Sequence, residues 1–281
     1  MMSRTPPTGD MRAAMKDAVK RSKGNQQQAK SARAQWKQQA KKQRKVRSMV
    51  ALAALAPIAL LSLLYPLHSL GYIRLFAPRP LARALANPQG TEKLKIRGYY
   101  LDEAPGDLEK LTKLRELNLD ANRLTKIDPV IFQLKNLRQL SLSGNDIKEI
   151  PSEISQLENL QQLHLMGNEI TTLPKELFQL KNLEVLVLNN NGVTSIPPDI
   201  KKLKKLRVLE IQDNSISKIP DELVTLPKLE ILRLSGNSLR DIPDFSRLKS
   251  LRNLALRNTG MRPKELDLLR KRLRKGATVN W

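Results

Sequence analysis

Few side chains in this sequence are suited to catalysis. The 281-residue chain has two histidines, His68 and His164, and no cysteine. It contains no glycine-rich phosphate loop and no nucleophile-elbow motif of the form GxSxG. Asp120 and Glu210 are expected on an exposed face, but they come from distant segments and stand too far apart to act as a carboxylate pair. The sequence therefore predicts a protein that is not an enzyme and that uses no cofactor or metal ion.

One polar side chain recurs at a fixed place among residues that should be buried. The stretch LSLSGNDIKEIP, Leu140–Pro151, carries Asn145 between two apolar pairs. Burying an amide costs free energy unless each of its polar groups finds a hydrogen-bond partner. A buried amide that recurs therefore predicts a structural ladder inside the protein and not a ligand site. The same spacing returns every 23 residues from Leu111, with asparagine at the equivalent place in six repeats: Asn122, Asn145, Asn168, Asn191, Asn214 and Asn237.

The full repeated pattern is LxxLxLxxNxL, and in most repeats a proline follows the last apolar position. With this pattern the chain resembles the leucine-rich repeat superfamily, in particular its 23-residue form, over about residues 91 to 281. The resemblance implies an α/β solenoid, a leucine-rich repeat horseshoe with a parallel sheet on its concave face. It also implies that this concave face binds a protein partner.

The spacing of apolar residues within one repeat agrees with this fold. Leu137, Leu140 and Leu142 are expected to point into the interior, and Gln139 and Ser141 to point outward from a short strand. The proline then opens an irregular or 3₁₀ segment, where no ladder hydrogen bond is wanted. One repeat cannot bury its own leucines, so neighbouring repeats must stack.

Departures from the pattern mark the ends of the array. Tyr99 replaces the asparagine in the first repeat, and Thr259 replaces it in the last. Pro263 then opens a helix with leucines on one face. The sequence thus predicts eight coils in three parts: a capping repeat at 91–110, six repeats at 111–247, and a last repeat with a helical cap at 248–281.

Residues 1–90 lie outside the repeats and contain one long apolar run. This run, at 48–73, has 26 residues without a formal charge, and about 20 suffice to cross a bilayer as a helix. A buried soluble helix is one alternative, but the N-terminal third offers no core to bury it. A cleaved signal peptide is another, yet 47 largely polar residues precede the run. We therefore predict an uncleaved transmembrane signal anchor at 48–73, followed by a linker at 74–90.

The segment before the anchor, 1–47, is strongly basic. It holds 14 Lys and Arg residues against two acids, and it lacks the apolar surface to fold alone, so we expect a partly helical or disordered tail. Nucleic-acid or ribosome docking is an alternative role, although the tail has no stacking platform of aromatic residues. Binding to anionic lipid head groups is the role that we favour. The residues expected to do so are Lys37, Lys41, Lys42, Arg44, Lys45 and Arg47.

The charges that flank the apolar run predict its orientation. Residues 30–47 contain eight Lys or Arg, and far fewer follow the run, so the positive-inside bias keeps the N-terminus in the cytoplasm and the repeats outside it. The absence of cysteine and of Asn-x-Ser/Thr sites fits a bacterial inner membrane best. A mitochondrial inner membrane is the alternative, because the basic start partly resembles a transit peptide.

The outward positions of the strands contain one apolar cluster with a charged rim. Such a surface is typical of a protein contact site. We therefore predict a non-enzymatic, membrane-tethered protein-binding module, with two alternatives: a cytoplasm-facing adaptor scaffold, and nucleic-acid docking through the basic tail. The predicted partner-binding residues are His164, Met166, Val185, Val187, Val208, Glu210, Ile231 and Arg233.

Overall fold

The computed structural model describes residues 78–240, 242–273 and 277–280. The basic tail at 1–47 with its head-group residues, the predicted anchor at 48–73 and the start of the predicted linker lie outside the described residues. In the described part of the chain, no helix has the length and apolar character needed to cross a membrane. The described residues belong to one compact unit, 77–281.

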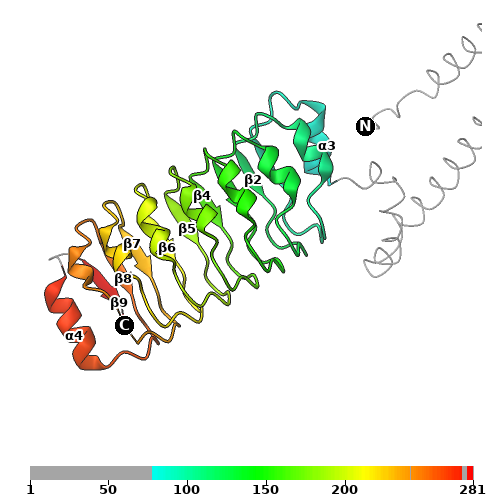
Figure 1. The fold of residues 1–281 in the computed structure, drawn as a ribbon. Helices are drawn as coiled ribbons and strands as arrows, with labels where there is room; N and C mark the ends of the chain where they lie inside the picture. The colour runs from blue at the N-terminus through cyan, green and yellow to red at the C-terminus, as the bar shows by residue number, and fades with distance from the viewer. Residues whose placement is uncertain (1–77, 241, 274–276, 281) are drawn as a thin grey trace, which may run out of the picture. The chain divides into compact units, whose positions relative to one another are not determined.

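This unit is a stack of coils, and each coil gives one short strand to a single parallel sheet (Figure 1). From β1 to β7 each residue pairs with the residue 23 positions later, as Glu116 does with Gln139. The parallel sheet of stacked repeats that the spacing predicts is therefore confirmed. Among the described residues the strands are β1 (Lys93–Lys95), β2 (Glu116–Asn118), β3 (Gln139–Ser141), β4 (Gln162–His164), β5 (Val185–Val187), β6 (Val208–Glu210), β7 (Ile231–Arg233), β8 (Asn253–Ala255) and β9 (Thr278–Asn280).

The opposite side of the stack consists of short 3₁₀ helices (Figure 1). Proline occupies the N-cap of five of them, because its fixed φ suits a helix start and no hydrogen bond from its nitrogen is needed there. In η4 and η9 the N-cap is Asp128 or Asp244, whose carboxylate accepts from the backbone two residues on. The helices are η3 (Gly106–Lys110), η4 (Pro129–Gln133), η5 (Ser152–Gln156), η6 (Lys175–Gln179), η7 (Pro198–Lys202), η8 (Asp221–Thr225) and η9 (Phe245–Arg247).

The core is a continuous column of apolar side chains between the strands and the 3₁₀ helices. Leu137, Leu140 and Leu142 are all fully buried, as the repeat pattern predicts. Ser141 differs from the expectation, because only 6% of it is exposed although it occupies an outward position. Its hydroxyl donates to Asp120 Oδ1 at 2.6 Å, so a hydrogen bond to the neighbouring coil holds the side chain down on the sheet.

The repeated asparagines join each coil to the preceding one through hydrogen bonds. Asn168 Oδ1 accepts from Ile147 N at 3.0 Å, and Nδ2 donates to Leu142 O at 3.1 Å and to Leu165 O at 3.0 Å. Leu142 O also accepts from Asn145 at 2.8 Å, so each such carbonyl serves the amides of two coils. The buried N–H of Ile147, in contrast, has a single partner among the described residues, the amide oxygen of Asn168 in the next coil.

A left-handed residue precedes each asparagine and turns the chain inward at the end of the strand. Gly144 has φ 66° and Gly167 has φ 65°. Ala121, Asn190 and Asp213 hold the same conformation at the same repeat position, with φ between 52° and 54°. Glycine adopts these angles without steric cost, whereas the other three do so because stacked coils on both sides fix the turn.

A helix covers the N-terminal end of the core. Helix α3 (Arg79–Ala86) buries Leu81 and Ala84 against the first coil. It falls in the segment 74–90, which we expected to be a linker. The first coil lacks its own asparagine. Asn122 of the second coil still accepts from the backbone N–H of Leu101, as the later asparagines do from their preceding coils, and it also accepts from Tyr99 N.

The C-terminal end is closed by helix α4 (Pro263–Arg272), which begins at the predicted proline and buries Leu269. Thr259 donates to Leu256 O at 2.8 Å, and its own backbone carbonyl accepts from Leu239 N at 2.9 Å. A main-chain group thus replaces the missing amide oxygen. Strand β9 adds a ninth coil that the sequence does not predict, because its three residues carry only one apolar side chain, that of Val279.

A second row of asparagines lies on the surface, at the turns that lead into β3, β4 and β5. Three exposed amides donate to the carbonyl 24 residues earlier, at 2.8 to 2.9 Å: Asn136 to Thr112, Asn159 to Lys135 and Asn182 to Glu158. These bonds satisfy turn carbonyls that have no partner in the sheet. This row was not among the predicted features, although its three asparagines follow the same 23-residue period.

Candidate protein-binding surface

The face of the sheet that points away from the core, called the open face here, carries the predicted partner-binding residues. Along β5, β6 and β7 the outward positions bring three aliphatic side chains into register, Val185 beside Val208 and Val208 beside Ile231. Val187 lies between His164 and Glu210 on the neighbouring strands. Five side chains, Met166, Val185, Val187, Val208 and Ile231, form the apolar patch.

The apolar patch remains partly accessible in the folded unit. Met166 is 44% exposed, and the four aliphatic residues of the patch are half-buried. The five patch residues together belong to four successive coils, so the patch is continuous across the middle of the open face. Apolar side chains at such positions contribute little to the core on the other side of the sheet.

One edge of the apolar patch is held by a charged pair. Glu210 Oε1 lies 2.7 Å from an Arg233 guanidinium nitrogen, and Asn189 donates to the other carboxylate oxygen at 3.1 Å. Because three coils contribute to this cluster, its side chains are fixed before a partner arrives. The structure thus brings all eight predicted residues onto adjacent coils of one face.

His164 borders the patch on its other edge, and its Nε2 atom is buried without a hydrogen-bond partner among the described residues. Burial lowers the pKa of His164, while the carboxylates of Asp120 and Glu210 act in the opposite direction and do not cancel this effect. The imidazole is therefore neutral at pH 7. It stands in the patch as a mostly apolar ring with one unsatisfied nitrogen.

Asp120 and Glu210 do not act together. Asp120 accepts from Ser141, from the Ser143 backbone and from Asn118 Nδ2 at 2.6 to 2.8 Å, while Glu210 lies four strands away with Arg233. Within the described ranges no group of three or more metal-ligating side chains converges. Asp120 and Glu210 therefore do not form a carboxylate pair on the open face.

A polar groove of about 350 Å³ lies at the edge where the chain enters β1 to β4. Arg138, Gln139, Gln161 and Gln162 line the end of the groove nearest the patch. Arg138 is not among the predicted partner-binding residues, because it stands one residue before β3 and not at an outward position within a strand. The same 23-residue period shows its surroundings, because the equivalent residues of the neighbouring coils are Arg115 and Gln161, neither of which is an acid.

The model of the family described as "Leucine rich repeat" matches residues 112–170, 158–216 and 204–261. The chain belongs to the leucine-rich repeat family. No curated relative matches it.

Solved leucine-rich repeat structures resemble this member over much of its length. One is the ectodomain of the plant membrane receptor kinase GASSHO1/SCHENGEN3 from Arabidopsis thaliana, solved in complex with CASPARIAN STRIP INTEGRITY FACTOR 2. It shares 33% identity and a TM-score of 0.54, and the match covers 60% of this chain and 21% of that one. Another is a Leptospira interrogans leucine-rich repeat protein, with 29% identity, a TM-score of 0.50, and coverage of 70% and 62%.

The functional domain of InlJ from Listeria monocytogenes is a third similar structure, with 27% identity, a TM-score of 0.52, and coverage of 59% of this chain and 34% of that one. That domain includes a cysteine ladder, whereas this leucine-rich repeat protein has no cysteine. The chain spans less than two thirds of the length of each of these three neighbours.

Proposed function

We propose that this leucine-rich repeat protein is a membrane-tethered interaction module that binds a protein partner on the open face of its sheet. The observation that carries the proposal is the continuous apolar patch over four coils, with the fixed Glu210–Arg233 pair at its edge. Leucine-rich repeat domains typically bind proteins, and the plant ectodomain was solved with a protein factor bound.

β-branched residues are common in strands for packing reasons alone, so their presence is not sufficient. The other outward positions of the open face are mostly polar, however, and the apolar residues gather in one place. An apolar centre with a polar, partly charged rim is the arrangement found in protein interfaces. A partner that covers the patch would remove its half-exposed side chains from water.

Charges placed in the apolar patch should abolish partner binding without unfolding the protein. In the double variant Val187→Glu with Val208→Lys, both new side chains can reach water from half-buried positions, so circular dichroism should be unchanged. Co-purification of the main partner with the tagged full-length chain should be lost, because docking would bury two charges.

The matched control is Thr194→Glu with Ser217→Lys, which places the same charges on the same two coils at exposed positions off the open face. This control should retain the partner. Retained binding by the folded patch variant would move the binding site away from the middle of the open face.

We further propose that residues 48–73 anchor the protein and that the repeats face the extracytoplasmic side. The support is the run of 26 uncharged residues and the excess of basic residues before it. A reporter that is active only in the periplasm, fused after Trp281 and expressed in a bacterium, should give signal. Activity from a cytoplasm-only reporter at the same site would reverse the orientation and favour the adaptor scaffold.

A further inference from the structure

We propose that the partner binds the open face as an extended segment, which places an acidic side chain against Arg138 and apolar side chains on the patch three to four residues further along. This inference rests on the proposed function, because it concerns the chemistry of the same surface. It adds a second contact point, the polar groove, and a spacing between the two.

Arg138 is the cation of the groove that has no acidic partner within the described residues. Lys93 lies 2.6 Å from Glu116, and Arg115 lies 3.4 Å from Glu92 on the side away from Arg138. Arg138 is exposed, and its lateral neighbour on the other side is the neutral Gln161. The guanidinium is therefore available to an incoming group.

The surroundings of Arg138 favour an anion with hydrogen-bond acceptors. The five charged residues that line the groove are three bases and two acids, so the groove has one positive charge in excess. The side-chain amides of Gln139, Gln161 and Gln162 make no hydrogen bond within the described residues and can donate. A planar guanidinium matches the two oxygens of a carboxylate, and neighbouring amide donors can complete the contact.

The groove continues directly into the apolar patch. The outward column of the sheet reads Gln139 on β3, Gln162 on β4, and then Val185, Val208 and Ile231 on β5 to β7. Strands stand about 4.8 Å apart, so roughly 10 to 14 Å separate the coil of Arg138 from the first two valines, which lie two and three strands further along. An extended segment covers that distance in about three to four residues.

The occupant inferred from this arrangement is a protein segment that carries an Asp or Glu side chain. The residues that line the groove come from the four successive coils of β1 to β4, so the groove extends along this edge of the sheet on both sides of Arg138. A segment can therefore pass over Arg138 and continue in both directions. Apolar side chains within reach of the same segment complete the recognition.

Panning of a phage-displayed random dodecapeptide library against the full-length chain in detergent tests this inference. Peptides retained by the wild type should be enriched in Asp or Glu three to four positions from a pair of apolar residues. The best synthetic peptide should bind Arg138→Gln roughly tenfold more weakly than the wild type. Arg138→Glu should select Lys or Arg at the same spacing. Arg97→Gln, which removes another exposed arginine of the open face, is the matched control and should bind like the wild type.

The outcomes separate this inference from the proposed function. Peptides that need the apolar patch but show no acidic preference, or that lose affinity equally in Arg97→Gln, would overturn the role of Arg138 and leave the patch intact. Acidic peptides that still bind the Val187→Glu, Val208→Lys variant would overturn the proposed spacing. If the wild type retains no peptide, the extended-segment inference is wrong, and co-purification of the partner decides the proposed function independently.

Discussion

Replacing Phe178 with alanine should lower the free energy of unfolding by about 3 to 5 kcal/mol, the usual range for a buried phenylalanine. Phe178 lies in η6 and is completely buried. The equivalent positions of the adjacent coils hold Ser155 and Lys201, which cannot move in to fill the space. The substitution should therefore leave a cavity between the 3₁₀ helices.

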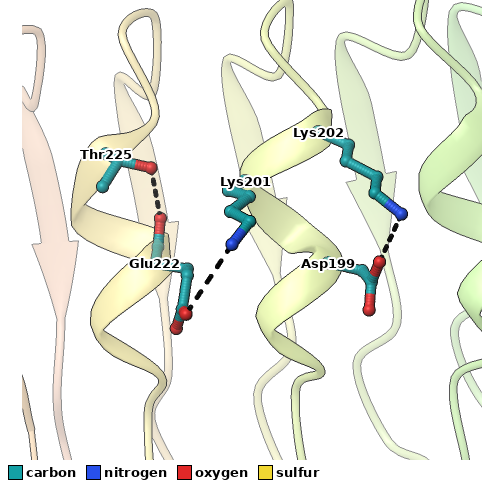
Figure 2. A network of polar contacts seen from close by, with 5 residues as sticks. All are labelled: Asp199, Lys201, Lys202, Glu222 and Thr225. Atoms are coloured by element: carbon teal, nitrogen blue, oxygen red, sulfur yellow. Dashed lines mark hydrogen bonds and ion pairs between the residues drawn. The ribbon is translucent and has the colours of Figure 1, made fainter.

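Urea denaturation of residues 77–281, followed by circular dichroism, measures this loss of stability. Lys201→Ala is the matched control at the same repeat position one coil later. Figure 2 shows that Lys201 points along the surface toward Glu222. The Lys201 ammonium lies 4.0 Å from a Glu222 carboxylate oxygen. Ion pairs of this exposed kind contribute about 0 to 1 kcal/mol. Equal losses in the two variants would mean that Phe178 does not pack as described.

The second large effect is expected for Asn168→Leu. This variant leaves the buried Ile147 N–H without a partner, which costs about 1 to 3 kcal/mol. Leu142 O and Leu165 O lose less, because each keeps a donor from another asparagine, Asn145 or Asn191. Most of the loss in unfolding free energy should therefore come from the unpaired backbone N–H of Ile147 and from the poor fit of the branched leucine side chain.

The same denaturation experiment applies, with Asn159→Leu as the control. Asn159 is exposed and donates to Lys135 O at 2.9 Å, so water can replace its hydrogen bond. Its substitution should change the unfolding free energy by a few tenths of a kcal/mol, as is usual for surface positions. If Asn159→Leu lowers the free energy of unfolding as much as Asn168→Leu does, the inner asparagines stabilise the fold no more than the surface ones.

The regular part of the fold could be predicted from the sequence because one period governs it. The 23-residue spacing placed the strands, the proline-capped 3₁₀ helices and the leucines of the core, and Pro263 located the helical cap. Strand β9 and helix α3 could not be predicted in the same way. Each occurs once, and each depends on covering an end of the core that has no counterpart in the repeats.

The candidate site was predictable to the same degree. The period alone brought Val185, Val208 and Ile231 into one column. It could not show that Asp120 accepts from Ser141 and holds this side chain down on the sheet, or that Asn189 donates to Glu210. A side chain on the sheet has a neighbour on each side, and the repeat period does not show with which of the two it forms a hydrogen bond. That depends on the side-chain conformations in the folded structure.

The two-coil sharing of carbonyls by the asparagines also bears on how such a protein can change in evolution. From Asn145 to Asn237 each inner asparagine bonds to the preceding coil in the same way, so duplication or loss of a whole 23-residue unit recreates this inner junction. The copy number of the coils can therefore vary while the end caps stay unchanged. Each added copy would lengthen the open face by about 4.8 Å. Insertion or loss of a coil between the polar groove and the apolar patch would therefore change the distance between them in steps of about 4.8 Å.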